Sequence, residues 1–520
     1  MKVQPFEALY DDNSLMHRAS REEFLTYVDH LGTSGLASRS RLLEERHYPH
    51  LAALTDELER QNPNMTERLR ERVAKLRTGE AQAVVTGQQT GIFGGPLYAI
   101  YKLLTCLKVA QQAEATLDRP VVPIFWLATE DHDFDEINHV YVPTADFQTR
   151  KIAVAPAETI ARSVSRLSFD QPALLEIIEE TFRAMPETIH TKRLVARLKQ
   201  LVEECTSYGM FFSQLIGELI DFDIVFFDAD THPVRELEIP FFERLIQDNA
   251  EFRQALTDGI TQTKELPDTF LNEEAAHLFI DDHGRQLLYP TASGFETKQG
   301  KRYTELELIA LLYASPERFS NSVVTRPLMQ DYLFPTLAYI GGPGELAYWT
   351  RLRPLFHHLK WTMPLLIPRM GGLLVRHSDE KRLMKLDVSL EEIVRSGVPI
   401  PVYSEEQMTG RLQTAAMLKD SFVSEFLSLE HQLLRTSSKS EKIKKQLEQS
   451  IASLLAEDRR QFDRQTRQYK ETAYHLLPDG APQERIHSIL PWLNHHGPDF
   501  VRDLRNAYEA NAAEQLKIFL

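Results

Sequence analysis

The sequence predicts an α/β fold with a Rossmann-like parallel sheet, connecting insertions and a helical C-terminal coiled coil. Two apolar runs, residues 83–86 and 121–128, predict buried strands because they lack the alternation of half-exposed strands. Between them lie a glycine-bearing loop and a helical segment that begins at Leu97, with Pro96 at its start. A strand, a crossover helix and a second strand form the unit from which parallel sheets are built.

The C-terminal region has a different pattern. Beyond Ser404 the chain is almost free of Gly and Pro up to Pro478, and its apolar residues recur every three or four positions. The polar stretch Thr436–Ser440 is either a turn between two antiparallel helices or part of one longer helix. In both cases the apolar stripe needs a partner, so we expect an intramolecular hairpin or a dimeric coiled coil that makes the protein a homodimer.

Five regions are expected along the chain. They are an N-terminal helical lead-in (1–80), the first part of the Rossmann-like core (81–145), its continuation with connecting insertions (146–320), the second part of the core (321–400) and the helical coiled-coil region (401–520). The apolar run at 222–230 should return to the sheet, and the segment 323–375 should add further core strands. Asp282, His283 and Gly284 separate two apolar runs and predict a β-hairpin.

Composition limits the classes of protein. The chain has 520 residues, enough for about three or four domains, and 59 Lys and Arg against 75 Asp and Glu give a net charge of −16. This acidic balance argues against a nucleic-acid partner. No apolar run reaches the roughly 20 residues that cross a bilayer, and acidic residues stand where a signal peptide would be apolar. Two cysteines are too few for a disulfide framework. We therefore expect a cytoplasmic enzyme.

A glycine-bearing loop, residues 87–96, follows the first predicted strand and opens a helix. Ligands of open α/β sheets bind at this edge, where glycines let them approach the backbone. The loop matches neither a Walker motif nor GxGxxG. The candidate nucleotide or substrate contacts are Thr86, Gly87, Gln88, Gln89, Gly94, Gly95, Pro96 and Tyr98. The alternative is a tight turn that needs its glycines for shape alone.

The second candidate segment, TEDHDFDEINH, follows the second predicted strand. Carboxylates and imidazoles at a strand end suit general acid/base chemistry, so Asp131 and His132 are the candidate catalytic residues. Candidate binding residues beside them are Trp126, Asp133 and Asn138. Alternatively, Asp133 or Asp135 caps a helix and Glu136 is solvated. A metal held by His132, Asp133 and His139 would match no strong signature, so we expect none.

The third candidate segment, RPLMQDYLFPTLAYIGGPGELAYW, combines Arg326, Gln330 and Asp331 with a glycine-bearing turn at residues 341–344. Glu345, at the start of the next predicted helix, could bind a ribose hydroxyl or a substrate amine. The candidate contacts are Gln330, Asp331, Gly341, Gly342, Gly344, Glu345, Tyr348 and Trp349. Because each segment follows an apolar strand, we expect the three to converge on one cleft at the C-terminal edge of the sheet.

Taken together, three stretches resemble the BshC family of cysteine-adding ligases in bacillithiol biosynthesis. They are VVTGQQTGIFGGPLYAIYK, PIFWLATEDHDFDEINHV and RPLMQDYLFPTLAYIGGPGELAYW. The resemblance covers most of the chain, including the helical C-terminal part. It implies a core like the nucleotide-binding domain of class I aminoacyl-tRNA synthetases and a coiled coil that pairs subunits.

The resemblance also implies a reaction. The family is expected to add L-cysteine to glucosaminyl-malate, with ATP as co-substrate forming a cysteinyl-adenylate and with no tightly bound metal. ATP would bind between the 87–96 loop and the 341–345 turn, and Asp131 or His132 would act as base. The stretch Pro368–Gly372 stands where a phosphate-binding loop is expected but lacks its lysines. Two other classes remain open, a metal-assisted amidohydrolase acting on a thiol conjugate and a non-catalytic coiled-coil scaffold.

Overall fold

The computed structural model describes residues 1–10, 14–156, 161–269, 271–400, 405–433, 438–511 and 515–520. They form two compact units. The first contains Met1–Val142, Arg150–Val375 and Gln483–Leu520, and the second contains Pro143–Thr149 and Arg376–Pro482. Among these residues, no helix is both long enough and apolar enough to cross a bilayer.

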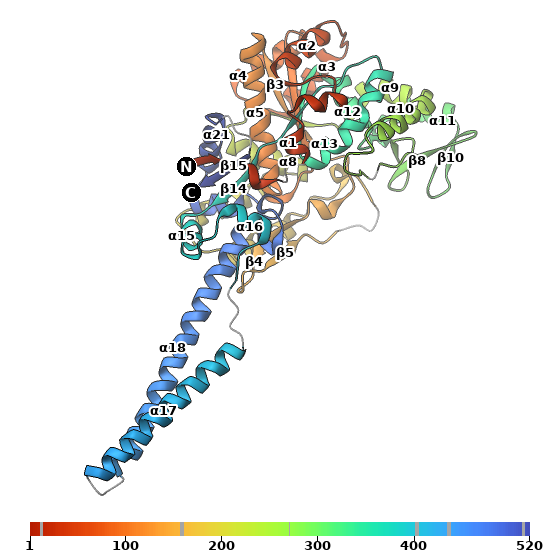
Figure 1. The fold of residues 1–520 in the computed structure, drawn as a ribbon. Coiled ribbons are helices and arrows are strands. Elements are labelled where there is room, and N and C mark those ends of the chain that lie inside the picture. Colours follow the sequence, from red (N-terminus) through yellow and green to blue (C-terminus); the bar gives the residue numbers. More distant parts are fainter. Residues whose placement is uncertain (11–13, 157–160, 270, 401–404, 434–437, 512–514) are drawn as a thin grey trace. The chain divides into compact units, whose positions relative to one another are not determined.

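A five-stranded sheet forms the centre of the first unit. Its order is β13 (Leu365–Pro368), β12 (Thr336–Gly341), β2 (Gln82–Gln88), β3 (Val121–Leu127) and β6 (Val225–Asp228), and all neighbours are parallel. Helix α5 (Leu97–Leu117) connects β2 to β3 (Figure 1). The expected parallel core, and the return of the 222–230 run to it, are confirmed.

Alternate residues of the central strands enter two separate cores. Val122, Ile124 and Trp126 of β3 join one core, whereas Val121 and Phe125 join the other. The helices of the first unit are α1 (Leu15–Arg18), α2 (Gly32–Glu44), α3 (Leu51–Gln61), α4 (Glu67–Arg77), α5, α6 (Gln171–Arg183), α7 (Thr191–Glu204), α8 (Tyr208–Leu219), α9 (His232–Gln247), α10 (Asn249–Gln262), α11 (Glu305–Ala314), α12 (Thr325–Leu333), α13 (Pro343–Trp349), α14 (Arg353–His358), α19 (Gln483–Ile486), α20 (Leu490–His496) and α21 (Phe500–Glu509). Apolar side chains from helices cover both faces of the sheet, which explains why its strands lack alternation.

Two smaller sheets complete this unit. One is antiparallel, with the order β10 (Arg302–Tyr303), β9 (Gly294–Thr297), β8 (Arg285–Thr291), β7 (Leu278–Asp281) and β11 (Phe319–Asn321). Strands β7 and β8 form the hairpin predicted around Asp282, His283 and Gly284. The other sheet joins β1 (Lys2–Pro5), β15 (Gln515–Phe519) and β14 (Gly371–Val375). Within the segment 323–375, therefore, β12 and β13 lie in the core sheet but β14 does not.

The second unit is dominated by two long helices. Helix α17 (Glu405–Leu433) and helix α18 (Ser438–Leu476) lie side by side (Figure 1). The shorter α15 (His377–Leu386) contacts α18, and α16 (Leu390–Ser396) belongs to the same unit. Arg411 forms an ion pair with Asp458, and Lys419 Nζ lies 3.7 Å from a carboxylate oxygen of Glu448, so the helices are antiparallel. One continuous helix is thereby excluded. Thr436 and Ser437 of the predicted turn lie outside the described residues.

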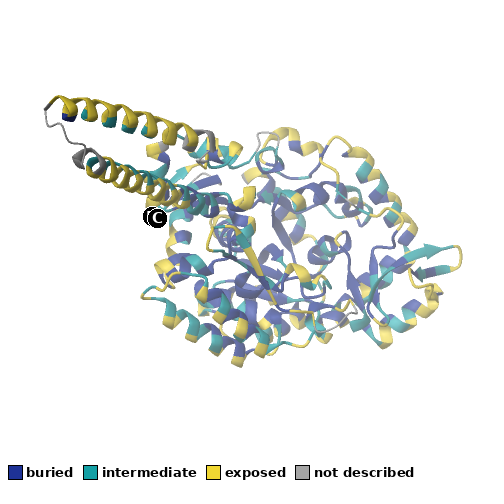
Figure 2. Ribbon diagram, turned by 90° about the horizontal axis from the view of Figure 1, so that it is seen from below, coloured by how far each residue is buried: buried dark blue, intermediate teal, exposed yellow. Residues whose placement is uncertain are grey.

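Burial differs between the two helices and the sheet core. The strands of the central sheet are mostly buried, whereas α17 and α18 are mostly exposed (Figure 2). The exposed side chains include large apolar ones, namely Leu412, Met417, Leu418, Phe422, Leu427, Leu429 and Leu454.

The hairpin β4 (His139–Pro143) and β5 (Thr149–Ala153) forms a separate two-stranded sheet.

Candidate functional site

A cleft of about 380 Å³ opens at the carboxyl ends of β2, β3 and β12. Side chains or backbone from all three candidate segments line it: Gly87, Gln88, Gln89 and Tyr98 from the first, Asp131 and Glu136 from the second, and Gly342, Gly344, Glu345 and Tyr348 from the third. The expected convergence of the three segments is confirmed. The cleft is also lined by four cations, Lys102, Arg326, Arg369 and Arg485. Arg326 belongs to the third candidate segment and Arg369 to the 368–372 stretch, but none of the four was among the candidate contacts.

Lys102 joins the first and third segments. It lies on α5, almost fully buried, and its Nζ donates to Gly87 O and Gln88 Oε1, each at 2.8 Å. It also lies 2.5 Å from the Glu345 carboxylate. Burial lowers the pKa of Lys102, while the Glu345 charge opposes that shift. The sequence signal that could have found Lys102 was a lysine within a largely apolar helix, although Lys108 of the same helix is buried as well.

Both carboxylate oxygens of Glu345 are bonded within the protein. Tyr339 donates to Oε1 at 2.5 Å, and the backbone N–H of Gly342 donates to Oε2 at 2.9 Å. Burial alone would raise the pKa of Glu345, but the Lys102 charge and these hydrogen bonds hold it below its ordinary value. Glu345 therefore fixes the Gly342 turn at the wall of the cleft.

Asp131 lies where the cleft meets two adjoining pockets. Its Oδ2 accepts from Gln89 Nε2 at 2.9 Å, and its Oδ1 accepts from the backbone N–H of His132 at 2.7 Å. Arg285 Nη1 lies 3.4 Å from Oδ1. Burial alone would raise the pKa of Asp131, but the hydrogen bond from the His132 backbone N–H, the Arg285 charge and the hydrogen bond from Gln89 hold it well below its ordinary value. Asp131 is thus a carboxylate at neutral pH.

Arg285 also determines which nitrogen of His132 carries a proton. Its Nη1 lies 3.0 Å from His132 Nδ1, and a guanidinium can only donate. Nδ1 therefore accepts, and the neutral imidazole carries its proton on Nε2. Arg285 is held by bonds to Ser320 Oγ at 3.0 Å and Asn321 O at 2.7 Å, and by the ring of Phe279.

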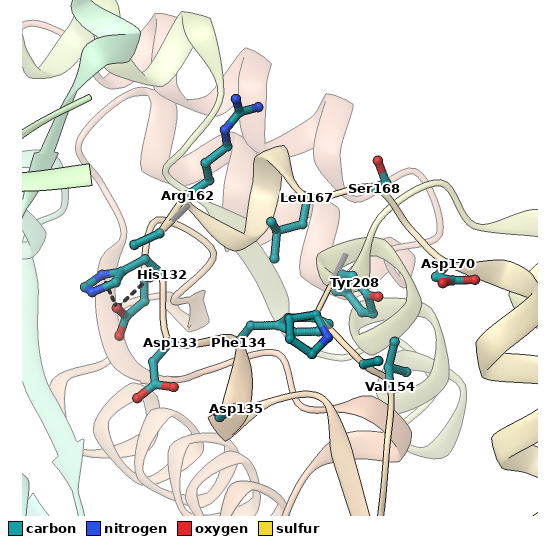
Figure 3. Close-up of a pocket in the computed structure, with 14 residues that line it drawn as sticks. His132, Asp133, Phe134, Asp135, Val154, Arg162, Leu167, Ser168, Asp170 and Tyr208 are labelled. Carbon is teal, nitrogen blue, oxygen red and sulfur yellow. Dashed lines mark hydrogen bonds and ion pairs between the residues drawn. The ribbon is translucent and has the colours of Figure 1, made fainter. Parts of the chain in front are cut away.

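One adjoining pocket, of about 490 Å³, is rich in acidic groups (Figure 3). Asp131, Asp133, Asp135 and Asp170 line it, together with His132, Arg162, Ser168 and Tyr208. Asp133 begins the short 3₁₀ helix 134–136 but its side chain accepts no capping hydrogen bond. A capping role for Asp133 is therefore wrong.

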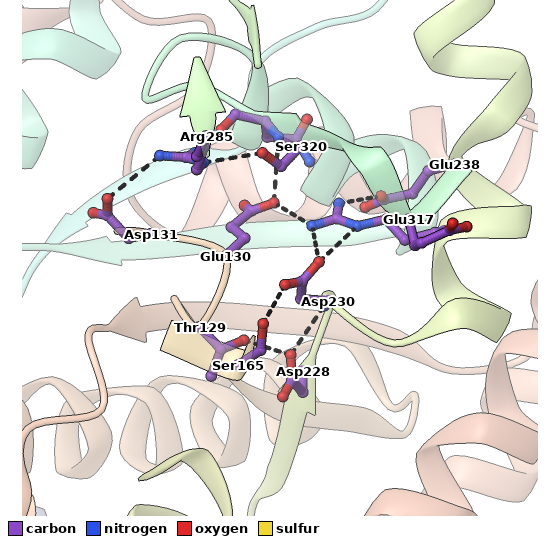
Figure 4. A network of polar contacts seen from close by, with 12 residues as sticks. Thr129, Glu130, Asp131, Ser165, Asp228, Asp230, Glu238, Arg285, Glu317 and Ser320 are labelled. Carbon is purple, nitrogen blue, oxygen red and sulfur yellow. Dashed lines mark hydrogen bonds and ion pairs between the residues drawn. The ribbon is translucent and has the colours of Figure 1, made fainter. Parts of the chain in front are cut away.

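Beneath the Asp131 loop lies a buried network of charges (Figure 4). Arg235 is fully buried, and its guanidinium lies 2.8 Å from Glu130, 3.0 Å from Asp230 and 2.5 Å from Glu238. Burial raises the pKa of Glu238 to about 8, although Arg235 opposes the shift. Since Glu130 precedes Asp131 directly, this network anchors the loop that carries Asp131.

The remaining candidate residues do not line the cleft. They are Thr86, Gly94, Gly95, Pro96, Trp126, Asp133, Asn138, Gln330, Asp331, Gly341 and Trp349, and His132 lines the adjoining pockets instead. Asp331 is fully buried between Arg39 and Arg46. The N–H groups of Gly94 and Gly95 donate to Gly91 O and Ile92 O. Both glycines have positive φ, so they serve the shape of the turn.

Other candidates take part in internal packing or bonding. Thr86 Oγ1 donates to Ile340 O at 3.0 Å, and Asn138 Nδ2 donates to Val154 O at 2.9 Å. Trp126 packs against Phe227, and Trp349 stacks on Tyr339 with 4.3 Å between ring centroids. In the part of the chain that the structure describes, no three His, Cys, Asp or Glu side chains are grouped so as to hold a metal ion.

Comparison with known proteins shows which protein family this architecture matches. Residues 21–370 match the family described as "Bacillithiol biosynthesis BshC, N-terminal Rossmann-like domain", and residues 418–520 match its "C-terminal coiled-coil domain". A solved structure titled as a putative arginyl-tRNA synthetase from Campylobacter jejuni is 9% identical, covers 85% of this chain and 99% of its own, and has a TM-score of 0.22.

Several relatives carry the name "Putative cysteine ligase BshC". The protein from Exiguobacterium sibiricum is 62% identical over 520 residues, covering 100% of both chains. The protein from Bacillus cytotoxicus is 34% identical and covers 83% of this chain and 84% of its own. The protein from Staphylococcus carnosus is 32% identical and covers 84% of each. With both domains matched and identity extending over the full length, this chain belongs to the BshC family.

Proposed function

We propose that this protein is a carbon–nitrogen ligase that adds L-cysteine to glucosaminyl-malate, with ATP activating the cysteine carboxylate. One observation carries the proposal: in a BshC-family chain, four cations and the Asp131 carboxylate face one cleft at the carboxyl edge of the parallel sheet. Anionic ligands are expected at this edge. The ligase is expected in the cytoplasm, where ATP is available.

The cleft and the acidic pocket offer opposite charges to the two halves of the reaction. Lys102, Arg326, Arg369 and Arg485 suit phosphate and carboxylate groups. The acidic pocket suits the ammonium form of the glucosamine amine. Asp131 lines both spaces, so an amine held by its carboxylate would lie at the border with the nucleotide.

The proposed chemistry has two steps. A cysteine carboxylate oxygen attacks the α-phosphorus of ATP, forming cysteinyl-adenylate and releasing pyrophosphate. The unprotonated glucosamine amine then attacks the activated carbonyl carbon, the amide C–N bond forms, AMP leaves, and the amine proton passes to a base.

Of the two predicted bases, the geometry favours Asp131. His132 Nδ1 already accepts from Arg285, so its Nε2 donates and can stabilise the developing oxyanion instead. Asp131 stays ionised and can orient the attacking amine through a hydrogen bond, but its lowered pKa makes it a weak acceptor of the amine proton.

A product assay tests this function. Purified protein is incubated with cysteine, glucosaminyl-malate and ATP, and bacillithiol and AMP are quantified by mass spectrometry. We expect equal amounts of both, and neither when any one substrate is omitted. Product formed without any nucleotide, or no product with any nucleotide, contradicts the proposed function.

We also infer that α17 and α18 pair two copies of the chain, because they expose large apolar side chains in the described residues. Leu418 and Phe422 lie one helical turn apart on α17 and are both exposed. Replacing both with Ser in the full-length chain should give a monomer by light scattering. A wild-type protein that is already monomeric at micromolar concentration contradicts the inference.

A further inference from the structure

Arg326 differs in its charge balance from Lys102 and Arg369, the two buried cations of the cleft, whereas the fourth cation, Arg485, is exposed. Arg326 is half-buried near the start of α12. It lines the cleft and also a second adjoining pocket, which Phe279 lines as well. Lys102 is paired with Glu345, and Arg369 lies 2.5 Å from Glu484. In contrast, Arg326 forms no ion pair within 4.0 Å with a carboxylate of a described residue, and Glu345 and Glu130 act on its charge from farther away.

The hydrogen bonds of Arg326 are also incomplete. Its Nη2 donates to Tyr348 Oη at 2.7 Å, which is the one side-chain hydrogen bond that its guanidinium forms with described residues. A guanidinium carries five N–H donors in a planar fork. Burying a cation without a counter-charge is unfavourable, so a half-buried arginine that lines a cleft is the expected place for an anionic ligand.

We propose that Arg326 binds a carboxylate or phosphate group of a substrate through two parallel hydrogen bonds. The ligand class follows from the fork, which matches two oxygens of one planar or tetrahedral anion. Tyr348 lies on α13 and is buried, so its hydroxyl holds the guanidinium in one orientation. This inference rests on the proposed function, which supplies three sources of the anion: the malate carboxylates, the cysteine carboxylate and the ATP phosphates.

Binding measurements separate these sources. Calorimetry with wild type, Arg326→Gln and Arg326→Lys uses glucosaminyl-malate, free L-malate, cysteine and ATP, each added alone. We expect Arg326→Gln to weaken one source about 10- to 100-fold, as for loss of hydrogen bonds to a charged group, and to leave the others unchanged. Arg326→Lys keeps the charge but not the fork, so it should recover only part of the affinity.

The matched control is Arg502→Gln, which removes the same charge from the exposed surface of α21, outside the cleft. It should bind every ligand as wild type does. Equal binding of all four ligands by Arg326→Gln and wild type overturns the proposal.

A second measurement uses the unaltered protein, in case Arg326→Gln does not fold. Phenylglyoxal modifies arginine side chains, and peptide mass spectrometry reports modification at Arg326. The bound source should protect Arg326 at saturating concentration, and equal modification with and without every ligand overturns the proposal. Because both measurements need no turnover, weakened binding in a protein that makes no bacillithiol would support the anion site while contradicting the proposed function.

Discussion

The cleft and the α17–α18 hairpin place their charged side chains in opposite ways. In the cleft, Lys102 and Arg369 are almost fully buried and pair with carboxylates far away in the sequence. In α18, Glu457 pairs with Arg460 and Arg464 of the same helix, and all three are exposed. A buried charge that loses its partner costs several kcal/mol, whereas an exposed pair contributes about 0–1 kcal/mol. Of these two regions, the cleft is therefore the one whose stability depends on single charged residues.

The largest effect is expected at Asp131. Asp131→Asn should lower bacillithiol formation by a factor of roughly 10²–10⁴, the usual contribution of a general acid/base group, with the fold intact. His132→Ala should fall in the same range through loss of the Nε2 donor. Asp133→Asn removes the same charge two positions away, where no capping bond is lost, and should cost less activity. Full activity in both Asp131→Asn and His132→Ala would remove them from the mechanism.

Breaking a buried pair of the cleft is the next largest change. Lys102→Met leaves the mostly buried Glu345 carboxylate without its cation, so the free energy of unfolding should fall by up to about 3–5 kcal/mol. Urea unfolding followed by circular dichroism measures it. A loss below about 1 kcal/mol would show that Tyr339 and Gly342 satisfy Glu345 by themselves.

These two regions also differ in how much the sequence predicts. The uninterrupted apolar runs predicted β2 and β3. The turn residues Asp282, His283 and Gly284 between two apolar runs predicted the β7–β8 hairpin. Both signals are local in the sequence. Helical periodicity predicted α17 and α18 as well, but left their connection open.

Contacts between distant segments escaped that reasoning. Asp331 was a candidate contact by its position near a glycine turn, yet it bonds Arg39 and Arg46, 292 and 285 positions away. Arg285 lies in the hairpin β7–β8 but reaches Asp131, 154 positions earlier. No local pattern shows which residues at a strand end turn toward a cleft, because that depends on such partners.

A pH effect is expected from the buried network beneath the Asp131 loop, because this network holds Glu238. The pKa of Glu238 is raised by burial from its ordinary 4.5 to about 8. The folded state therefore binds a proton that the unfolded state has lost between these values. This contribution to stability is fully present below pH 4.5 and is lost as the pH rises through 8.

The test compares unfolding free energies of wild type and Glu238→Gln between pH 5 and pH 8.5. Wild type should lose stability relative to Glu238→Gln as the pH rises, since Gln cannot ionise. Parallel curves would mean that Arg235 keeps Glu238 ionised in the folded state throughout this range.

The smallest effect on stability is expected in the α17–α18 hairpin. Glu457→Gln removes two exposed ion pairs, at 3.2 Å to Arg460 and 3.1 Å to Arg464, so the free energy of unfolding should fall by about 0.3–1 kcal/mol. Because solvent-exposed pairs are screened, the difference should vanish at about 1 M salt, whereas the loss in Lys102→Met should persist. Urea unfolding of both variants at low and high salt measures the contrast. A loss above about 2 kcal/mol for Glu457→Gln would mean that a second copy covers this charged face of α18, in addition to the exposed apolar side chains of the two helices.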